Sequence, residues 1–249
     1  MGSFNLNTMP ASKIKVLSTR TINPGLLREA LEHNILIDEL SFINTELCDD
    51  KNTSVRIAEL LKEKINAIFT SMTSIEAVNK HIKEKEIPSW RIYCIGNTTK
   101  KLAKDKFSLN NIVATANNSQ QLAIEIIKDD PKDVIFFCGN HRRNELPQTL
   151  ENAGIKVEEL VVYKTTGEAH TLTNEYDAIL FFSPSAVTSF FSTNTLRSGT
   201  IIFAIGATTA ETVRDHTTNP LIISDTPGKS DLVHKMIEHF SSKNITCSD

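Results

Sequence analysis

Short apolar runs alternate with amphipathic segments along almost the whole chain. The runs are rich in β-branched and aromatic residues, which is typical of strands buried on both faces. The segments between them repeat apolar positions with the period of a helix that covers a sheet. We expect strands at 14–17, 67–69, 91–95, 112–114, 134–138, 160–163, 178–182, 201–205 and 221–223, and helices at 53–63, 74–82, 119–128, 145–152, 186–191, 208–214 and 230–240. The pattern predicts an α/β protein with parallel sheets.

The chain also contains an internal repeat. Four pairs of segments match: 36–45 (LIDELSFINT) with 156–165 (KVEELVVYKT), 67–71 with 178–183, 94–99 (CIGNTT) with 204–209 (AIGATT), and 113–127 with 223–237. The pairs occur in the same order in both copies. An ordered series of this kind indicates two copies of one α/β unit, near 13–130 and 133–240.

Composition agrees with two folded units. The 249 residues accommodate two domains of about 120 each. Hydrophobic residues make up 40% and charged residues 23%, close to a globular average. The net charge of -3 excludes a broad basic surface for nucleic acid. No apolar run approaches the roughly 18 residues of a membrane span.

The cysteines and the N-terminus bear on the compartment. Cys48, Cys94, Cys138 and Cys247 form no CxxC pair. Scattered cysteines of this kind indicate reduced, mostly buried thiols rather than a disulfide framework. The N-terminus lacks the basic-then-apolar pattern of a signal peptide. We therefore expect a reducing cytosol or an organelle interior, with the cytoplasm as the default.

Several common motifs are absent or incomplete. Residues 226–230 (TPGKS) resemble the end of a phosphate-binding loop, but Ile223 stands where that motif needs glycine. No GxGxxG fingerprint follows the first strand, and the chain contains neither HExxH nor GxSxG. We expect no metal and no cofactor.

Ser- and Thr-rich turns follow most of the expected strands. In open α/β sheets, ligands bind outside the carboxyl ends of the strands. Each turn also opens a helix, whose free N–H groups favour anions. Helix capping alone explains any single turn, but six turns of one chemistry favour a cleft for a ligand with several carboxylates or phosphates. The turns lie at 18–20, 70–74, 96–99, 183–185, 206–209 and 225–230.

Two further features concern the second copy of the repeat. Residues 139–143 (GNHRR) follow a strand and form either a basic binding turn or a solvated loop. Tyr163 stands where the first copy has Ile43. Its hydroxyl suits a proton donor, although an edge strand explains a tyrosine equally well. These residues by themselves indicate an anion-binding α/β protein and no particular reaction.

From about residue 16 to residue 240, the chain resembles the uroporphyrinogen-III synthase family. The segments that carry the resemblance are 67–78 (AIFTSMTSIEAV), 93–99 (YCIGNTT), 136–165, 179–191, 203–213 and 224–233. The resemblance implies two similar α/β domains that exchange elements and are joined by two crossing β-strands, near 41–47 and 162–168. One domain would be 1–43 plus 167–249, and the other 44–166. Two consecutive, unswapped domains are the alternative.

The resemblance also implies a reaction and a site. The family's enzymes are lyases of haem biosynthesis that cyclise hydroxymethylbilane, a linear tetrapyrrole with eight carboxylates, to uroporphyrinogen III. Ring D is inverted and water is lost. Tyr163 would be the catalytic proton donor to the leaving hydroxyl. The implied substrate contacts are Thr70, Ser71, Thr98, Ser183, Ser185, Thr208, Thr226 and Lys229, to which the basic turn adds Arg142 and Arg143.

The implied partner is this small-molecule substrate, with no nucleic acid and no membrane. We expect a monomer, with hydroxymethylbilane synthase as a candidate transient partner. Two readings compete with the lyase. One is a non-enzymatic two-domain module that binds an anionic ligand or regulates through it. The other is a scaffold whose turns only cap helices.

Overall fold

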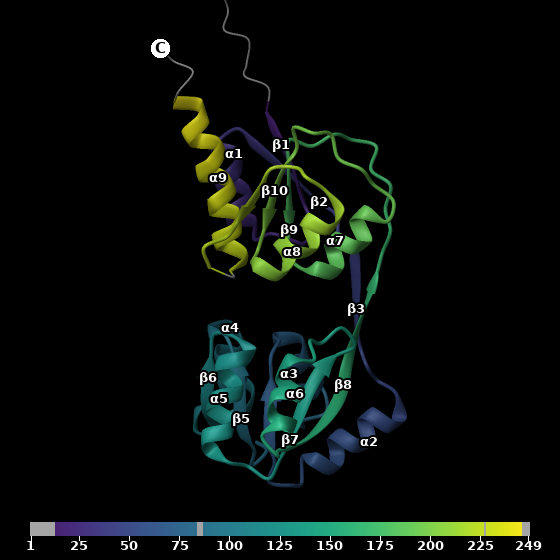
Figure 1. Ribbon diagram of the computed structural model, residues 1–249, viewed down its shortest axis with the longest axis vertical. Helices are drawn as coiled ribbons and strands as arrows, with labels where there is room; N and C mark the ends of the chain where they lie inside the picture. The colour runs from purple at the N-terminus through teal and green to yellow at the C-terminus, as the bar shows by residue number, and fades with distance from the viewer. Residues whose placement is uncertain (1–12, 84–86, 227, 246–249) are drawn as a thin grey trace, which may run out of the picture. The chain divides into compact units, whose positions relative to one another are not determined.

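The computed structural model describes residues 13–83, 87–226 and 228–245. Its contacts divide the chain into two compact units, shown in Figure 1. Unit 1 consists of residues 1–44 and 166–249, and unit 2 of residues 45–165. The boundaries expected from the sequence lie one residue from these, and the assignment of the two units as domains stays a prediction.

Unit 1 is a parallel sheet between two layers of helices. The strand order is β11-β10-β9-β1-β2, and every pair with a described register is parallel. Val16 and Leu17 point to opposite faces, toward α1 and α9 on one side and α7 and α8 on the other. The elements are β1 (Ile14–Ser18), α1 (Pro24–Glu32), β2 (Ile35–Glu39), β9 (Ala178–Phe181), α7 (Pro184–Phe191), β10 (Ile201–Ala204), α8 (Ala207–His216), β11 (Leu221–Ile223) and α9 (Lys229–Ile245).

Unit 2 has the same three layers. Its sheet order is β3-β8-β7-β4-β5-β6. Helices α2, α3 and α4 cover one face, and α5 and α6 cover the other. The elements are β3 (Ile43–Leu47), α2 (Lys51–Leu60), β4 (Asn66–Phe69), α3 (Met72–Asn79), β5 (Arg91–Ile95), α4 (Asn97–Phe107), a 3₁₀ turn (Leu109–Asn111), β6 (Ile112–Ala116), α5 (Ser119–Asp129), β7 (Asp133–Gly139), α6 (Glu145–Asn152) and β8 (Lys156–Gly167).

The chain passes between the units on two neighbouring strands, β3 and β8. The Glu168 amide donates to the Phe42 carbonyl at 2.9 Å, and the Cys48 amide donates to the Val162 carbonyl at 2.9 Å. The paired residue numbers rise on one strand as they fall on the other, so the two strands run antiparallel. The predicted crossing strands are therefore confirmed.

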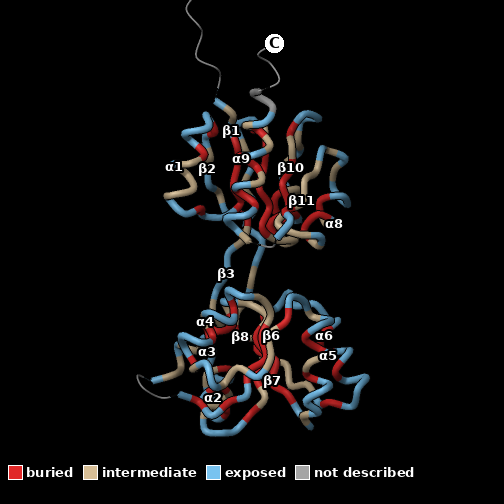
Figure 2. Tube along the Cα trace, turned by 90° about the vertical axis from the view of Figure 1, so that its left-hand side faces the viewer, coloured by how far each residue is buried: buried red, intermediate tan, exposed pale blue. Residues whose placement is uncertain are grey.

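Burial explains why the strands read as continuous apolar runs. In β7, Ile135 and Phe137 pack into one core while Val134, Phe136 and Cys138 pack into the other. A parallel sheet covered on both faces needs apolar side chains at every position of its central strands. Figure 2 shows the buried residues gathered along the strands inside each unit.

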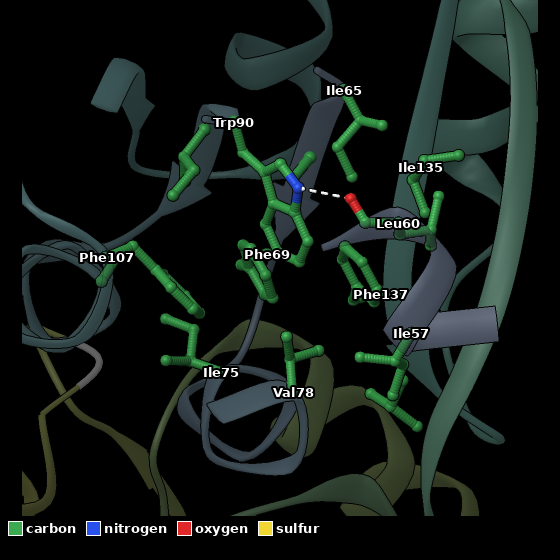
Figure 3. Packing of buried hydrophobic residues seen from close by; sticks show 14 of the residues in the cluster. Ile57, Leu60, Ile65, Phe69, Ile75, Val78, Trp90, Phe107, Ile135 and Phe137 are labelled. Carbon is green, nitrogen blue, oxygen red and sulfur yellow. Dashed lines mark hydrogen bonds between the residues drawn. The ribbon is translucent and has the colours of Figure 1, made fainter. Parts of the chain in front are cut away.

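An aromatic stack fills one core of unit 2 (Figure 3). The rings of Phe69 and Phe137 stack with centroids 5.0 Å apart, and Trp90 stacks on Phe137 at 5.4 Å. The Trp90 indole N–H donates to the Leu60 carbonyl at 2.9 Å, which satisfies its only polar atom. This core holds the strands whose carboxyl ends carry the candidate site.

The α/β class with parallel sheets is confirmed, while several elements were not anticipated. Helix α4 buries only Thr99, Ala103 and Phe107, a face too weakly apolar to stand out. Helix α1 and strand β2 were also missing from the predicted elements, and β3 was expected only as one of the two crossing strands. The last helix was predicted to end at residue 240, whereas α9 continues to Ile245.

The cysteine expectation holds for two of the four residues. Cys94 and Cys138 are free and buried, and burial raises the pKa of the Cys138 thiol to about 12. Cys48 is free but only partly buried. Cys247 lies outside the described residues. Among the helices that the structure describes, none is long and apolar enough to cross a membrane.

Candidate functional site

A pocket of about 520 Å³ lies at the carboxyl ends of the unit 2 strands. Five of the eleven predicted site residues line it, namely Thr70, Ser71, Arg142, Arg143 and Tyr163. They come from the turns after β4 and β7 and from β8, segments far apart in the sequence. The parallel arrangement of β4, β7 and β8 places these segments at one edge of the sheet.

Three helices begin at this pocket. The Ser71 hydroxyl accepts from the Ser74 amide at 3.2 Å and caps α3. The Asn118 side chain accepts from the Gln121 amide at 2.9 Å and caps α5. Glu145 opens α6 and lines the same pocket. Unpaired N–H groups and the positive ends of helix dipoles favour an anionic ligand here.

The basic turn after β7 supplies two arginines, of which one is ion-paired within the protein and the other is not. The Arg142 guanidinium is paired with Glu159 on β8, and this partner raises the pKa of Arg142. Arg143 is exposed and forms no ion pair with any residue in the described part of the chain. Arg143 is thus the guanidinium available to a ligand, while Arg142 fastens the turn to the sheet.

Tyr163 is partly buried at the rim of the aromatic core. Its ring packs against that core, and its side chain also lines the pocket. A tyrosine in this position presents an apolar body to the protein and a hydroxyl to a ligand.

Five predicted residues belong to unit 1 and lie at the carboxyl ends of its strands. The Ser183 hydroxyl accepts from the Ala186 amide at 3.2 Å and caps α7, and Ser185 follows in the first turn. Thr208 occupies the first turn of α8 without capping it. Thr226 is exposed in the turn after β11. Because β9, β10 and β11 are parallel, these residues share one edge of the unit 1 sheet.

Lys229 adds a cation to this edge. It opens α9, and its ammonium donates to the Thr21 carbonyl, in the turn after β1, at 2.9 Å. Partial burial, together with the charge of Arg20, lowers the pKa of Lys229. Arg20 and Lys229 place two cations near each other at this edge, with Glu39 as an acidic neighbour, and such cations can bind a carboxylate or phosphate.

The structure does not gather every predicted residue into the pocket. Thr98 is exposed in the first turn of α4 and is not among the residues that line the unit 2 pocket. Gly96, which precedes that turn, has a φ of 81° and so needs glycine for its backbone conformation. A role for Thr98 stays a prediction.

The structure adds residues that the sequence did not single out. Asn118, Ser119 and Gln120 line the pocket from the turn after β6. They have the same hydroxyl and amide character as the recognised turns. The strand before them was predicted to end at residue 114, whereas β6 continues to Ala116, so their place at the strand end was hidden.

A second pocket, of about 510 Å³, lies in unit 1 before β9 and β10. It is lined by residues 171–176 and 193–197, with Ile179 and Thr200. Arg197 at its rim is paired with Asp177 at 2.7 Å and with Glu175 at 3.4 Å. The pocket lies at the sheet edge opposite the predicted residues, and its one arginine is already neutralised.

Metal binding finds no support among the residues that the structure describes. No three His, Cys, Asp or Glu side chains of this part of the chain are grouped to hold an ion. The chemistry available at the described site is that of hydroxyls, amides, helix N-termini, arginines and one tyrosine.

Comparison with known proteins gives consistent results. A family model described as uroporphyrinogen-III synthase HemD matches residues 27–234. The uroporphyrinogen-III synthase of Saccharomyces cerevisiae is 26% identical over 133 residues, which are 47% of this chain and 48% of the yeast protein. The match thus spans about half the length of that curated relative.

Solved structures share the fold. A mutant uroporphyrinogen III synthase from Thermus thermophilus matches with a TM-score of 0.64 and 13% identity, over 92% of this chain and 99% of its own. The uroporphyrinogen-III synthetase of Helicobacter pylori matches with a TM-score of 0.63 and 17% identity, over 91% and 99%. At these identities the likeness shows the fold alone.

Proposed function

Since the chain belongs to the uroporphyrinogen-III synthase HemD family, we propose that it is a lyase that converts hydroxymethylbilane to uroporphyrinogen III. Ring D is inverted during closure, and one molecule of water is lost. One observation carries the proposal within the structure. The tyrosine of β8 lines the same pocket as two hydroxyl residues of the β4 turn and the basic turn after β7.

The donors at this pocket suit a ligand with many carboxylates. Burying several fixed charges to match eight carboxylates would carry a large desolvation penalty. Helix N-termini and hydroxyls donate hydrogen bonds without adding full charges. Thr70, Ser71 and the start of α5 offer such donors, and Arg143 adds one free cation. The set can hold a flexible polyanion in one folded shape, and such positioning is worth several kcal/mol.

Tyr163 takes the role of general acid. Its phenolic proton passes to the hydroxyl that leaves as water, while the C–O bond breaks and the substrate becomes an azafulvenium cation. The substituted α-carbon of ring D then bonds to that cation and gives a spiro intermediate. The bond from this carbon to the methylene that links rings C and D breaks, and the methylene carbon bonds to the free α-carbon of ring D, which inverts the ring. That free α-carbon then loses its proton. That last proton restores the phenol. The substrate's own carboxylates stabilise the cation.

The unit 1 residues Ser183, Ser185, Thr208, Thr226 and Lys229 are proposed as further substrate contacts. They repeat the chemistry of the unit 2 pocket on the matching edge of a second sheet. Lys229 is the strongest of them, because its ammonium has a carbonyl partner and a neighbouring cation but no carboxylate within ion-pair distance among the described residues.

The enzyme would act as a monomer in the cytoplasm, without a cofactor. Hydroxymethylbilane synthase, whose product is the substrate, would be its transient partner.

Product isomer analysis tests the proposal directly. Purified protein is mixed with freshly generated hydroxymethylbilane, the products are oxidised, and type I and type III porphyrins are separated. Unassisted bilane closes without inversion to type I. We expect mainly type III at catalytic protein levels. Type I alone, with a thermal shift on adding a polycarboxylated porphyrinogen, would instead establish the non-enzymatic binding module.

A further inference from the structure

The strand pair that carries Tyr163 is irregular at that residue. Pairing between β7 and β8 is regular up to Cys138 and Val161, and then shifts so that Gly139 pairs with Tyr163. The extra residue on β8 is Val162, which is fully buried. A bulge of this kind bends the strand and re-aims the side chain that follows. Tyr163 therefore leaves the simple alternation of β8 where its ring reaches the pocket.

Gly139 leaves room for the hydroxyl end of the Tyr163 ring. A Cβ at Gly139 would lie 2.8 Å from the Tyr163 hydroxyl oxygen and still closer to Cε2 and Cζ. The glycines with positive φ in the described chain are Gly96 and Gly154. Gly139 therefore has a backbone conformation that any residue can adopt. Glycine is needed here for space, because the phenol lies directly on its α-carbon.

Asn140 fixes the strand on the other side of the tyrosine. Its amide donates to the Tyr163 carbonyl at 3.2 Å. Its side chain accepts from the Thr165 amide at 2.8 Å and donates to the Thr165 carbonyl at 3.1 Å. The side chain thus takes the place of a neighbouring strand beyond the end of β7 and holds the part of β8 that directly follows the bulge.

We propose that Gly139 and Asn140 are positioning residues that seat the Tyr163 hydroxyl in the unit 2 pocket. Gly139 provides the space that the phenol occupies, and Asn140 holds the backbone from which the ring projects. The catalytic consequence rests on the proposed function, in which that hydroxyl donates a proton. The placement of the ring does not depend on the proposed function.

The kinetic test is a double-mutant cycle of Gly139→Ala and Tyr163→Phe. A general acid typically contributes a factor of about 10² or more to kcat. We expect Gly139→Ala to lower kcat at least about tenfold with little change in KM, since a displaced acid still leaves the binding groups in place. In the Tyr163→Phe background the same change should lower kcat less than about twofold, because its target is already gone.

The spectroscopic test is independent of turnover. The chain has three tyrosines, Tyr93, Tyr163 and Tyr176, so ¹³Cζ-tyrosine labelling gives three NMR signals, and Tyr163→Phe assigns one of them. Gly139→Ala should move the Tyr163 signal and leave the other two. The matched control is Gly199→Ala, because a Cβ at Gly199 meets nothing within 4 Å. This control should leave all three signals and kcat unchanged.

Asn140→Ala provides a second, exposed variant in case Gly139→Ala does not fold. It should move the Tyr163 signal and lower kcat about threefold to tenfold, because two hydrogen bonds to the backbone of Thr165 are lost. A Tyr163 signal that neither variant moves would overturn the inference. So would an active Gly139→Ala enzyme with unchanged kcat when Tyr163→Phe is slow. If the signal moves but the wild-type protein forms no type III product, the proposed function fails and the placement of the ring stands.

Discussion

The two units build the same sheet from different parts of the chain. In unit 2 the order β6-β5-β4-β7-β8 comes from one continuous stretch, whereas in unit 1 the order β11-β10-β9-β1-β2 combines both ends of the sequence. Strand β9 takes the place of β4, and β1 takes the place of β7. These matches agree with the repeat, in which 67–71 corresponds to 178–183. A parallel sheet requires neighbours in a given order and does not require that they be consecutive in the chain.

The shared frame carries different chemistry at its carboxyl edge. The matching strand pairs place Val16 and Ile135 at equivalent positions. Four residues further along, unit 1 has Arg20 where unit 2 has Gly139. The edge of unit 1 therefore gains a cation near Lys229, while that of unit 2 gains room for a phenol. The two units thus share one sheet arrangement but have different residues at the carboxyl ends of their strands. We expect them to respond differently to the same kinds of substitution.

The largest effect is expected in the aromatic cores. Phe69 lies between two stacked rings in unit 2, and Phe190 meets three rings in unit 1. Either residue changed to Ala should lower the free energy of unfolding of its own unit by about 3–5 kcal/mol. Trp90 is the only tryptophan and is buried in unit 2, so its fluorescence reports on that unit during urea denaturation.

Phe69→Ala should therefore lower the urea midpoint of unfolding that is detected by Trp90 fluorescence. Phe190→Ala should mainly lower the urea midpoint that is detected by circular dichroism. The two variants test whether the units fold independently. Equal shifts of the fluorescence midpoint in both variants would show that the chain unfolds as one cooperative body.

The second effect separates the tyrosines of the two units. Tyr163→Phe should lower kcat about 100-fold or more, since the proposed proton donor is lost. Tyr176→Phe is the matched control, because the Tyr176 hydroxyl donates to Asp38 at 3.1 Å and lies in unit 1. The kcat of each variant is measured from the steady-state rate at which type III product forms. Full kcat in Tyr163→Phe would remove this residue from the mechanism.

The sequence predicts the frame better than the site. After their exposed first residues, Arg91 and Asp133, the central strands β5 and β7 are almost continuously apolar, so both their existence and approximate bounds could be predicted directly. Strand β8 has charged residues on both sides of its apolar centre and was predicted from that centre alone, whereas it extends over Lys156–Gly167. Partly exposed strands carry a weaker signal because only one side of each is buried.

The site required tertiary information that no local pattern contains. The turns at 70–74 and 139–143 were recognised one by one, but their meeting at one pocket follows from the neighbouring positions of β4 and β7. The pairing of Arg142 with Glu159 was equally hidden, since the two residues come from different elements. Space for the Tyr163 ring over Gly139 depends on a bulge, which the sequence does not mark.

The third effect compares the cations at the two edges. Lys229→Gln in unit 1 and Arg143→Gln in unit 2 should each raise KM about tenfold to 100-fold, because each removes a charged hydrogen bond to a substrate carboxylate. Arg142→Gln should change KM less, since Arg142 is already paired with Glu159. The measurement is the KM for bilane of each variant at one fixed salt concentration. If Arg142→Gln has the larger effect, the ion pair opens on binding and our assignment of the free cation is wrong.

A smaller effect distinguishes capping from binding at two equivalent serines. Ser71 and Ser183 each accept a backbone N–H bond at 3.2 Å. Changing either to Ala should lower stability by about 1 kcal/mol. Asp also caps helices well, so Ser71→Asp and Ser183→Asp should keep the stability and raise KM through repulsion of substrate carboxylates. An unchanged KM in an Asp variant would leave that serine with a capping role alone.

The smallest effect concerns an ion pair that fastens α2 to the unit 2 sheet. Arg56 donates Nε and Nη2 to Glu158 at 2.8 Å each, and this lowers the pKa of Glu158. A carboxyl whose folded pKa is lowered stabilises the protein above its unfolded pKa, about 4.3, and loses that contribution as pH falls through the folded value. The pair is about one-third exposed, so Arg56→Met should lower stability at pH 7 by less than about 1 kcal/mol.

The difference between wild type and Arg56→Met should therefore close between about pH 5 and pH 3, which urea denaturation followed by Trp90 fluorescence can measure. The unit 1 counterpart is Arg197→Met, where Arg197 pairs with Asp177 but is about half exposed. Because that pair belongs to the other unit, its loss should leave the fluorescence midpoint unchanged at every pH. If the stability difference between wild type and Arg56→Met stays constant down to pH 3, Arg56 contributes through packing of its aliphatic stem instead of its charge.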